Sequence, residues 1–365
     1  MTYPSPIHIL LEQFELDINV VDEANNRDGA ATGTYQSKAL TDFLPWGDGG
    51  CFVVATTGIV ELEYAAIQKS VGVFDAPCRG TIELKGEDRL ACINRMTTQK
   101  VDKMKQGDAL LAFVTSRKGT IVADVIIRVF EDRILLDVDI TVASQLVDHL
   151  NSYIVMEDVV IENKTASVHW LWCIGPEAKN ILIDDVQLQP LPKELLGLDS
   201  VAIMIEHERA PEVWENLLQH GFKPVGWYAL NMARIERGAP VFMIDFDMHN
   251  LPHETNVMAS RVCFDKGCYL GQEIIARMES LGQPKQKIMR LVMQSDDLPI
   301  AGSQLWNDAT AVGTPVGVVT SSAISPLSGS LPSVLAMVSK KSNNDGVPVF
   351  VHVGTDIIEA RVESI

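Results

Sequence analysis

The chain has 365 residues, of which 47% are hydrophobic and 21% are charged, and its formal net charge is −18. This composition excludes wholesale disorder and fibrous architectures, and the length predicts roughly two to three domains. The acidic balance disfavours a basic nucleic-acid-binding face, and no apolar run reaches the ~20 residues that a membrane span needs. Six dispersed cysteines without a C-x-x-C pair, after an N-terminus without a basic leader, predict reduced thiols in a cytoplasmic protein.

The first half of the chain predicts short helices and antiparallel strands. We expect a short helix over Ser5–Leu16 and a surface loop over Glu23–Gly33. Apolar residues at three-residue spacing predict a helix over Asp88–Met96, and a helical stripe runs from Val142 to Ile154. Between these helices, tight-turn residues separate three β-rich runs, which predict an antiparallel meander over Ala109–Thr115, Thr120–Phe130 and Arg133–Val138.

The second half changes its pattern near Gly282–Pro284. Before that point we expect strands over Ala166–Ile174 and Val201–Glu206, and helices over Pro211–His220 and Trp227–Arg237, each closed by a glycine. After it, five short β runs separated by turn residues predict a small antiparallel barrel or sandwich. The chain is therefore predicted to divide into residues 1–282 and residues 285–365.

The most unusual segment covers residues 264–277 and reads FDKGCYLGQEIIAR. Gly267 and Gly271 allow tight turns, and a helix is expected to begin near Gly271. Cys268 would then precede a helix N-terminus, whose dipole stabilises a thiolate, and Lys266 would add positive charge. This pattern is typical of a reactive cysteine. A small apolar residue in a turn is the alternative interpretation.

Residues Lys266–Glu273 resemble the K-G-C-[YF]-x-G-Q-E signature of the YgfZ family of folate-binding proteins. Two flanking stretches resemble further elements of that family: Arg234–Gly238 matches R-x-E-x-G, and Pro252–Asn256 matches P-x-E-[TS]-N. The resemblance implies that the chain binds tetrahydrofolate or a derivative of it. It also implies a part in iron–sulfur cluster assembly or repair, with an indirect role in tRNA modification.

The wider chain is similar to the glycine-cleavage T protein superfamily, whose aminomethyltransferases use tetrahydrofolate. The similarity lies in Val71–Asp75, Arg117–Asp124 and Gly313–Ser321. It implies an α+β fold, built as a three-part ring around a central folate channel and ending in an antiparallel β-barrel. Two departures weaken the aminomethyltransferase interpretation. Ala123 replaces one member of the usual Asp pair, and the G-Y-x-G-E-x-G-Y-E segment before Trp214 is missing, although Glu206 or Glu208 could replace its carboxylate.

These patterns define the expected site. Cys268 is predicted to attack or ligate as a thiolate, Lys266 to lower its pKa, and Asp124 to act as a base that orients the folate amine. For several of the residues expected to contact folate, the alternative is an exposed charge on a helix or an aromatic side chain in the core. Those residues are Arg234, Glu236, Trp227, Tyr228, Asn256, Tyr269, Gly271, Gln272 and Glu273. No permanent metal is expected, because the nearby His and Cys residues fit no zinc spacing.

Three functions remain open at this point. The leading one is a tetrahydrofolate-binding protein that assists iron–sulfur cluster assembly or repair, with iron–sulfur proteins or their assembly machinery as transient partners. No direct nucleic-acid partner and no membrane partner are expected. The second is a folate-dependent aminomethyl- or methyltransferase that depends on Asp124. The third is a non-enzymatic scaffold with a vestigial folate site.

Overall fold

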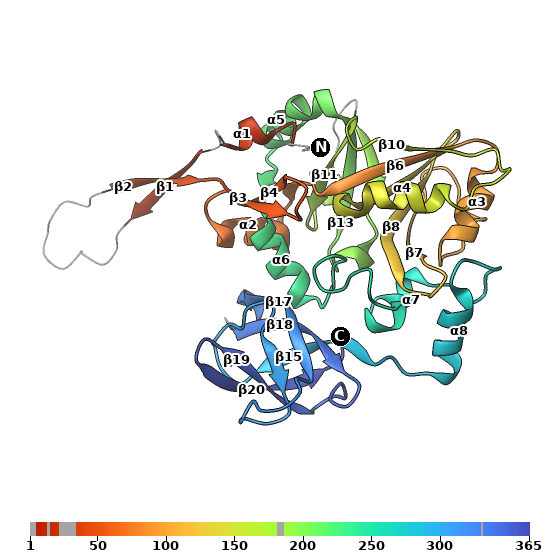
Figure 1. The fold of residues 1–365 in the computed structure, drawn as a ribbon. Helices are drawn as coiled ribbons and strands as arrows, with labels where there is room; N and C mark the ends of the chain where they lie inside the picture. Colours follow the sequence, from red (N-terminus) through yellow and green to blue (C-terminus); the bar gives the residue numbers. More distant parts are fainter. Residues whose placement is uncertain (1–4, 13–14, 22–33, 181–185, 330) are drawn as a thin grey trace, which may run out of the picture.

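The computed structural model describes residues 5–12, 15–21, 34–180, 186–329 and 331–365. Within them, two five-stranded sheets form the upper body of the molecule and a β-barrel lies below (Figure 1). This arrangement is the predicted α+β architecture with a C-terminal antiparallel barrel. The expected loop over Glu23–Gly33 lies outside the described residues.

The first sheet has the strand order β10-β6-β9-β8-β7 and is antiparallel throughout. It contains the predicted meander, which is confirmed, because β7, β8 and β9 pair in sequence order. Helices α3 (Arg89–Met96) and α4 (Ala143–Asn151) belong to the same part of the chain. The strands are β6 (Arg79–Lys85), β7 (Ala109–Thr115), β8 (Ile121–Val129), β9 (Ile134–Asp139) and β10 (Val160–Asn163).

The second sheet has the order β12-β13-β11-β5-β14, in which only β14 runs parallel to its neighbour. Its strands are β5 (Gly72–Asp75), β11 (Val168–Ile174), β12 (Gln187–Pro190), β13 (Ser200–Glu206) and β14 (Lys223–Pro224). Three helices accompany it: α2 (Val60–Lys69), α5 (Ala210–Gln219) and α6 (Trp227–Glu236). Helix α6 contacts both α2 and the barrel strand β17, so it connects this sheet to the barrel.

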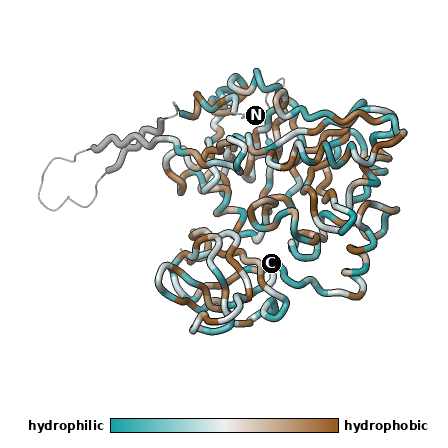
Figure 2. Tube along the Cα trace, viewed as in Figure 1, coloured by the Kyte–Doolittle hydropathy of each residue, from teal (hydrophilic) through white to brown (hydrophobic). Residues whose placement is uncertain are grey.

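The C-terminal barrel closes in the order β15-β18-β17-β16-β19-β20. Its strands are β15 (Gln286–Met293), β16 (Gln304–Trp306), β17 (Gly317–Ser325), β18 (Leu331–Ser339), β19 (Pro348–Val353) and β20 (Asp356–Glu363). Alternate residues of these strands point inward and form a separate apolar core, centred on Leu305, Val334 and Val351. The predicted barrel is therefore confirmed. Figure 2 shows hydrophobic and hydrophilic residues interspersed along the chain, in the barrel and in the upper body.

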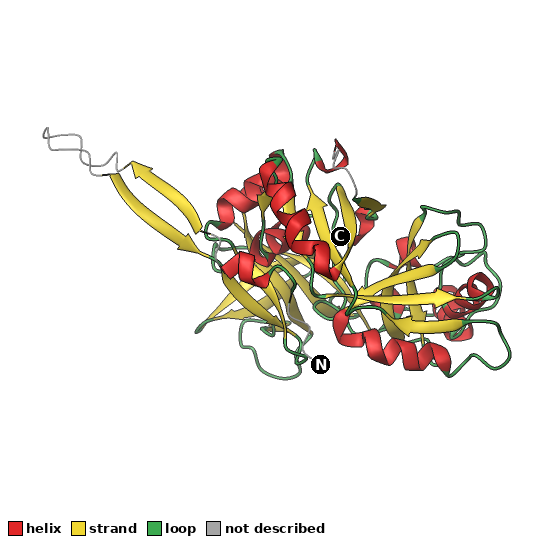
Figure 3. Ribbon diagram, turned by 90° about the horizontal axis from the view of Figure 1, so that it is seen from above, coloured by secondary structure: helices red, strands yellow, loops and turns green. Residues whose placement is uncertain are grey.

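The N-terminal segment differs from its prediction. The helix is short, α1 (His8–Glu12), and the chain continues as strand β1 (Glu15–Val21), which pairs with β2 (Thr34–Leu40). The prediction that the helix extends to Leu16 is therefore wrong. Leu16, Ile18 and Val20 alternate with polar residues, and this pattern favours a strand. The β1–β2 ribbon projects from the body (Figures 1 and 3), and a second hairpin, β3 (Asp42–Trp46) and β4 (Cys51–Thr56), joins it to α2.

Between α6 and the barrel, the chain returns to the first sheet. It forms a 3-10 turn (Pro252–Glu254), the short helix α7 (Met258–Arg261) and helix α8 (Gln272–Leu281). Residues Val262, Tyr269 and Ile275 of this return segment join the apolar core of the first sheet. The unusual segment found in the sequence is thus packed against the first sheet, and α8 then leads into the barrel (Figure 1).

Candidate functional site

The loop between α7 and α8 is held to the first sheet by backbone hydrogen bonds at both ends. We call residues 264–271 the signature loop. Just before the loop, Cys263 N donates to Thr98 O at 2.9 Å. Near its end, Leu270 N donates to Arg95 O at 3.1 Å, and Thr115 Oγ1 donates to Leu270 O at 2.6 Å. Both ends of the loop are therefore fixed to α3, to β7 and to Thr98 between them.

Lys266 fixes the middle of the signature loop. Its Nζ donates to the carbonyl oxygens of Asn94, Thr97 and Gln99 at 2.7, 2.7 and 2.6 Å. These carbonyls lie at the C-terminal end of α3, where unpaired carbonyl groups and the helix dipole favour a cation. Burial nevertheless lowers the pKa of Lys266 to about 8, and the charge of Asp102 opposes this effect only partly. The lysine is a buried anchor of the loop.

Gly271 ends the loop and begins the helix. Its φ is +83°, and a Cβ atom there would lie 2.4 Å from Ser116 O. Both the left-handed backbone and the close approach require glycine at this position. The helix α8 begins at the next residue, Gln272, so the predicted helix start is confirmed. Gln272 and Glu273 lie in its first turn, half-buried and exposed respectively.

Cys268 is exposed, whereas Cys51, Cys78, Cys92 and Cys173 are buried and Cys263 is half-buried. Its neighbour Tyr269 is buried under Lys266, whose Nζ lies 5.2 Å from the centroid of the Tyr269 ring. Burial raises the pKa of Tyr269 to about 12. The loop therefore points Lys266 and Tyr269 into the protein and presents the Cys268 thiol to solvent. Lys266 donates its hydrogen bonds to carbonyls at the end of α3, so its buried position is explained by its role in anchoring the loop.

Asp124 lies on β8 inside the protein and pairs with Arg261 of α7. Arg261 Nε lies 2.9 Å from Asp124 Oδ1 and 3.0 Å from Oδ2, and both side chains are buried. Arg261 O also accepts a hydrogen bond from Thr98 Oγ1 at 2.6 Å. The Asp124–Arg261 pair therefore joins the meander to the segment that carries the signature loop.

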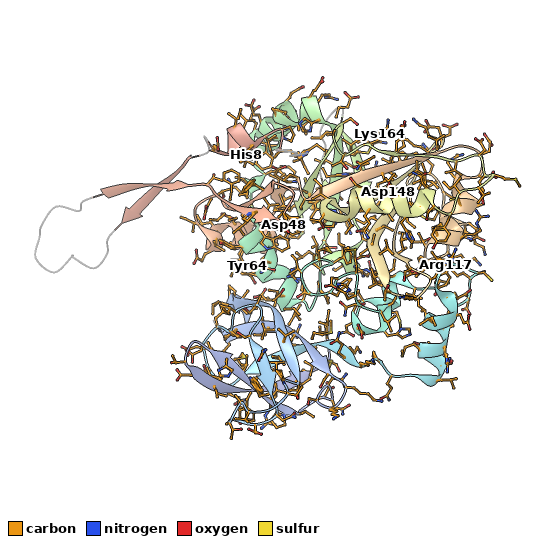
Figure 4. All side chains as sticks on the ribbon, in the orientation of Figure 1. His8, Asp48, Tyr64, Arg117, Asp148 and Lys164 are labelled. Atoms are coloured by element: carbon orange, nitrogen blue, oxygen red, sulfur yellow. The ribbon has the colours of Figure 1, made fainter. Side chains whose placement is uncertain are left out.

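Arg234 and Glu236 connect α6 to the barrel. The fully buried Arg234 guanidinium donates through Nη1 to Asp245 Oδ2 and through Nη2 to Ser321 Oγ, both at 2.7 Å. Glu236 accepts hydrogen bonds from Tyr64 Oη and Ser325 Oγ, both at 2.6 Å. Tyr64 is labelled in Figure 4, beside α6. Both side chains expected to contact folate thus make contacts within the protein.

A cavity of about 590 Å³ lies next to α6, between the second hairpin and the end of β9. Its lining comprises Trp46, Gly47, Asp48, Gly49, Cys51, Ile140, Thr141, Ser144 and Met243. The predicted residue Trp227 stands directly behind this lining, because its ring contacts Trp46 edge-to-face at 4.9 Å. The size of the cavity suits a small-molecule ligand.

Met243 enters this cavity on a strained loop. Its φ is +67°, which is unusual for a residue other than glycine. The turn is held by Met243 N donating to Phe246 O at 2.7 Å, and by Asp245 Oδ2 accepting from Val241 N at 2.9 Å. Asp245 is also the partner of Arg234. Arg234 is therefore linked to the cavity wall through Asp245 and the loop that carries Met243.

The cavity fits the ring portion of a folate better than its tail. Trp46, Ile140 and Met243 offer apolar surface against which a flat ring system can pack, and Thr141 and Ser144 offer hydroxyl groups. Asp48 is the one charged side chain among the described residues of the lining. The carboxylates of a folate tail would therefore find no cation on these walls.

The remaining predicted residues lie elsewhere. Tyr228 is exposed on α6, and Asn256, with a φ of +60°, lies in the loop before α7. A larger groove of about 750 Å³ lies by β6 and β13, where Lys85, Arg133 and Lys164 surround Glu83. In Figure 4, Asp48 at the cavity, Arg117 near α8 and Lys164 at this groove are well separated. The predicted site residues are thus distributed over the signature loop, the α6–barrel interface, the cavity wall and the Asp124–Arg261 pair.

Sequence reasoning missed Trp46, Met243, Asp245 and Arg261. The turn Gly47–Gly50 next to Trp46 was a visible signal of a special loop, but its partner residues are more than 90 positions away. In the described ranges, no three His, Cys, Asp or Glu side chains are close enough to hold a metal ion. Over the same ranges, no helix is long and apolar enough to cross a membrane.

Comparisons with known proteins agree with this architecture. Residues 35–191 match the family model described as the GCVT N-terminal domain. The chain is 24% identical over 330 residues to an aminomethyltransferase of Chloroherpeton thalassium, covering 82% of this chain and 88% of that protein. It is 27% identical over 295 residues to an aminomethyltransferase of Thermus thermophilus, covering 74% and 80%.

A solved structure has the same fold. The crystal structure of glycine cleavage system aminomethyltransferase T from Bartonella henselae superposes with a TM-score of 0.82 at 19% identity, covering 100% of this chain and 98% of that one. Residues 35–191 thus match the GCVT N-terminal domain, the chain is similar to aminomethyltransferases over most of its length, and it shares the fold of glycine cleavage system aminomethyltransferase T.

Proposed function

We propose that this chain is a folate-binding protein of the YgfZ type, which uses the thiol of Cys268 in the assembly or repair of iron–sulfur clusters. One observation carries the proposal: the signature loop is anchored by Lys266, Leu270 and Gly271 while Cys268 between them is exposed. Thiolate is the usual ligand of iron–sulfur clusters and the reactive form of cysteine. If Cys268 served only to pack the loop, its thiol would not need to be both exposed and held between fixed residues.

Folate is proposed to occupy the cavity at Trp46. Because aromatic stacking on a heterocyclic base contributes roughly 1–3 kcal/mol, the Trp46 ring is the strongest single contact available on these walls. Trp227 supports Trp46 from behind, and Arg234, through Asp245, positions the loop that carries Met243 of the same cavity lining. Tetrahydrofolate supplies one-carbon chemistry when it is bound; the residues of this chain bind the ring system and exclude water from it.

The cysteine proposal is tested in cells that lack the native protein. Cys268→Ala is compared with Cys263→Ala, a half-buried cysteine five residues earlier in the same segment. We expect Cys263→Ala to restore the activity of iron–sulfur enzymes and Cys268→Ala to fail, with equal amounts of folded protein. Full recovery with Cys268→Ala would exclude this role for the thiol.

The folate proposal is tested by calorimetric titration with tetrahydrofolate. Trp46→Ala should weaken binding by about 5- to 150-fold, which corresponds to the loss of one stacked ring. Leu62→Ala is the matched control, because Leu62 is exposed on α2 and lines a different groove. Equal affinity of the two variants would place the ligand elsewhere. No binding by the unmodified protein, with its cellular activity intact, would instead favour a scaffold.

Aminomethyl transfer is the second candidate, because the similar relatives are named aminomethyltransferases. In this case Asp124 would orient the folate amine. Purified protein is supplied with tetrahydrofolate and with methyl or aminomethyl donors. Turnover that Asp124→Asn abolishes would favour transfer, and no turnover with any donor would count against it.

A further inference from the structure

Positive charge is concentrated in one part of this acidic chain. Residues 89–118 contain seven lysines and arginines and two aspartates, a net charge of +5, so the rest of the chain carries −23. This segment runs from α3 to the turn after β7. In an otherwise acidic protein, such a cationic segment attracts negatively charged partners to its own part of the surface.

The cationic segment is the one that holds the signature loop. The carbonyls of Asn94, Thr97 and Gln99 bind Lys266, and Arg95 O binds Leu270 N. The turn Ser116–Gly119 packs against Gly271. The segment that carries these basic side chains is therefore bound directly to the loop that presents Cys268. We call them the basic rim: Arg95, Lys100, Lys103, Lys105, Arg117 and Lys118.

Most of the rim is accessible to a partner. Lys103, Lys105, Arg117 and Lys118 are exposed, and Lys100 is half-exposed. The Arg117 guanidinium lies over the Tyr153 ring, 5.5 Å from its centroid, and Arg117 is labelled near α8 in Figure 4. Arg95 is exposed as well, but it is paired with Glu157, their Nη2 and Oε1 atoms lying 2.5 Å apart.

Exposed apolar side chains accompany the rim. Val155 and Met156 are 86% and 93% exposed and directly precede Glu157, the partner of Arg95. Phe264 begins the signature loop and Ile274 lies in α8 with its Cβ near Gly119, and both are exposed. Methionine and aromatic residues are enriched where proteins bind each other, so this surface has the character of a protein interface.

We propose that the basic rim and its apolar neighbours dock an acidic surface of another protein, which brings a thiol or cluster of that protein to Cys268. The proposal rests on the role proposed above for Cys268 and adds the chemistry of its partner. A protein fits better than a nucleic acid, because the exposed apolar side chains of Val155, Met156 and Phe264 have no use against a phosphate backbone.

The test measures how fast Cys268 reacts with charged probes. The protein used in the assay carries Cys263→Ser, which removes the half-buried thiol. Among the described residues, the remaining cysteines other than Cys268 are buried. The probes are two peptides of equal length, one acidic and one basic, each with a single cysteine in a mixed disulfide with thionitrobenzoate. The Cys268 thiolate attacks the peptide sulfur, the peptide disulfide with Cys268 forms, and thionitrobenzoate leaves as a coloured thiolate.

We expect the acidic peptide to react about tenfold faster than the basic one at low salt, because attraction raises the encounter rate. The ratio should approach one as salt screens the charges. Arg117→Glu with Lys118→Glu should lower the ratio to one or below. The matched control, Lys340→Glu with Lys341→Glu on the exposed barrel surface, should leave it unchanged.

Equal rates for the two peptides at low salt would overturn the proposal, as would an equal effect of the barrel control. A short RNA that slows the reaction more than a cysteine-free acidic peptide would overturn it in favour of a nucleic-acid surface. This assay needs neither folate nor iron–sulfur enzymes. A lack of selectivity between the peptides would therefore refute only the docking proposal. The proposed function itself would be refuted by a different result, namely full recovery of iron–sulfur enzyme activity in cells with Cys268→Ala.

Discussion

The signature loop and the α6–barrel interface are both built around a buried cation, but the two cations are satisfied differently. Lys266 donates to three neutral backbone carbonyls, whereas Arg234 is paired with the carboxylate of Asp245. The pKa of Lys266 is lowered to about 8, so the ammonium group that anchors the loop loses its proton not far above neutral pH.

The difference shows how each region serves its role. The α6–barrel interface is a permanent joint that supports the cavity wall at Met243. The signature loop is held by a charge that burial disfavours, so its fixation costs stability when the lysine is protonated. Substitutions at the two cations and at Gly271, which ends the signature loop, can separate these roles.

The largest effect is expected at the permanent joint. Arg234→Leu leaves the buried Asp245 carboxylate without its partner, and we expect a loss of about 3–5 kcal/mol in the free energy of unfolding. Urea denaturation measures this loss. The double variant Arg234→Leu with Asp245→Leu should recover much of it, because no unpaired charge remains.

Arg361→Leu is the control for the loss of an arginine. Its guanidinium is exposed and lies 3.4 Å from Glu359, so we expect a change of about 0–1 kcal/mol. A loss at Arg234 no larger than the loss at Arg361 would show that the α6–barrel joint does not depend on the buried pair.

The second effect concerns the end of the signature loop. Gly271→Ala places a Cβ 2.4 Å from Ser116 O at a φ of +83°, and it should cost about 2–3 kcal/mol in the free energy of unfolding. Gly267→Ala is a matched control in the same loop, since no atom lies within 4 Å of its Cβ and its φ is not left-handed. Its stability should stay within ~0.5 kcal/mol of the unmodified protein. Similar costs at the two glycines would contradict the close packing of Gly271.

The third effect depends on pH. The pKa of Lys266 is about 8 when folded and 10.5 in the ordinary state, so the unfolded chain binds more protons between these values. Stability contributed through Lys266 therefore rises as pH increases from about 8 to about 10.5, by roughly 1–3 kcal/mol. Other groups titrate in this range, so the measurement is the difference between the unmodified protein and Lys266→Met across the range. A constant difference would contradict the lowered pKa.

Local patterns in the sequence predicted much of the fold. The meander and the barrel were visible because strand alternation and turn residues are local signals, and the start of α8 was visible from Gly271. The partners of buried charges were not visible. Asp124 and Arg261 are 137 positions apart and Arg234 and Ser321 are 87 apart, and pattern alone does not specify such pairings.

The same limit explains the distribution of the predicted site residues. Arg234 and Glu236 matched a family motif, but the motif did not tell whether the side chains face a ligand or the barrel. The wall of the cavity is assembled from three separate segments, at Trp46, Ile140 and Met243. The turn Gly47–Gly50 marks a loop beside Trp46, but none of the three segments carries a local signal that it meets the other two.

The smallest effect on stability is expected at Cys268 itself. Because the thiol is exposed between two fixed anchors, Cys268→Ser should change the free energy of unfolding by less than about 0.5 kcal/mol. The buried Cys92→Ser should cost about 1–3 kcal/mol, since it places a hydroxyl group in the core of the first sheet. Denaturation of both variants, together with the recovery of iron–sulfur enzymes in cells, separates chemistry from folding. A stable Cys268→Ser protein that fails in cells would assign the loss to the thiol, whereas a loss of stability equal to that of Cys92→Ser would mean that Cys268 is part of the packing.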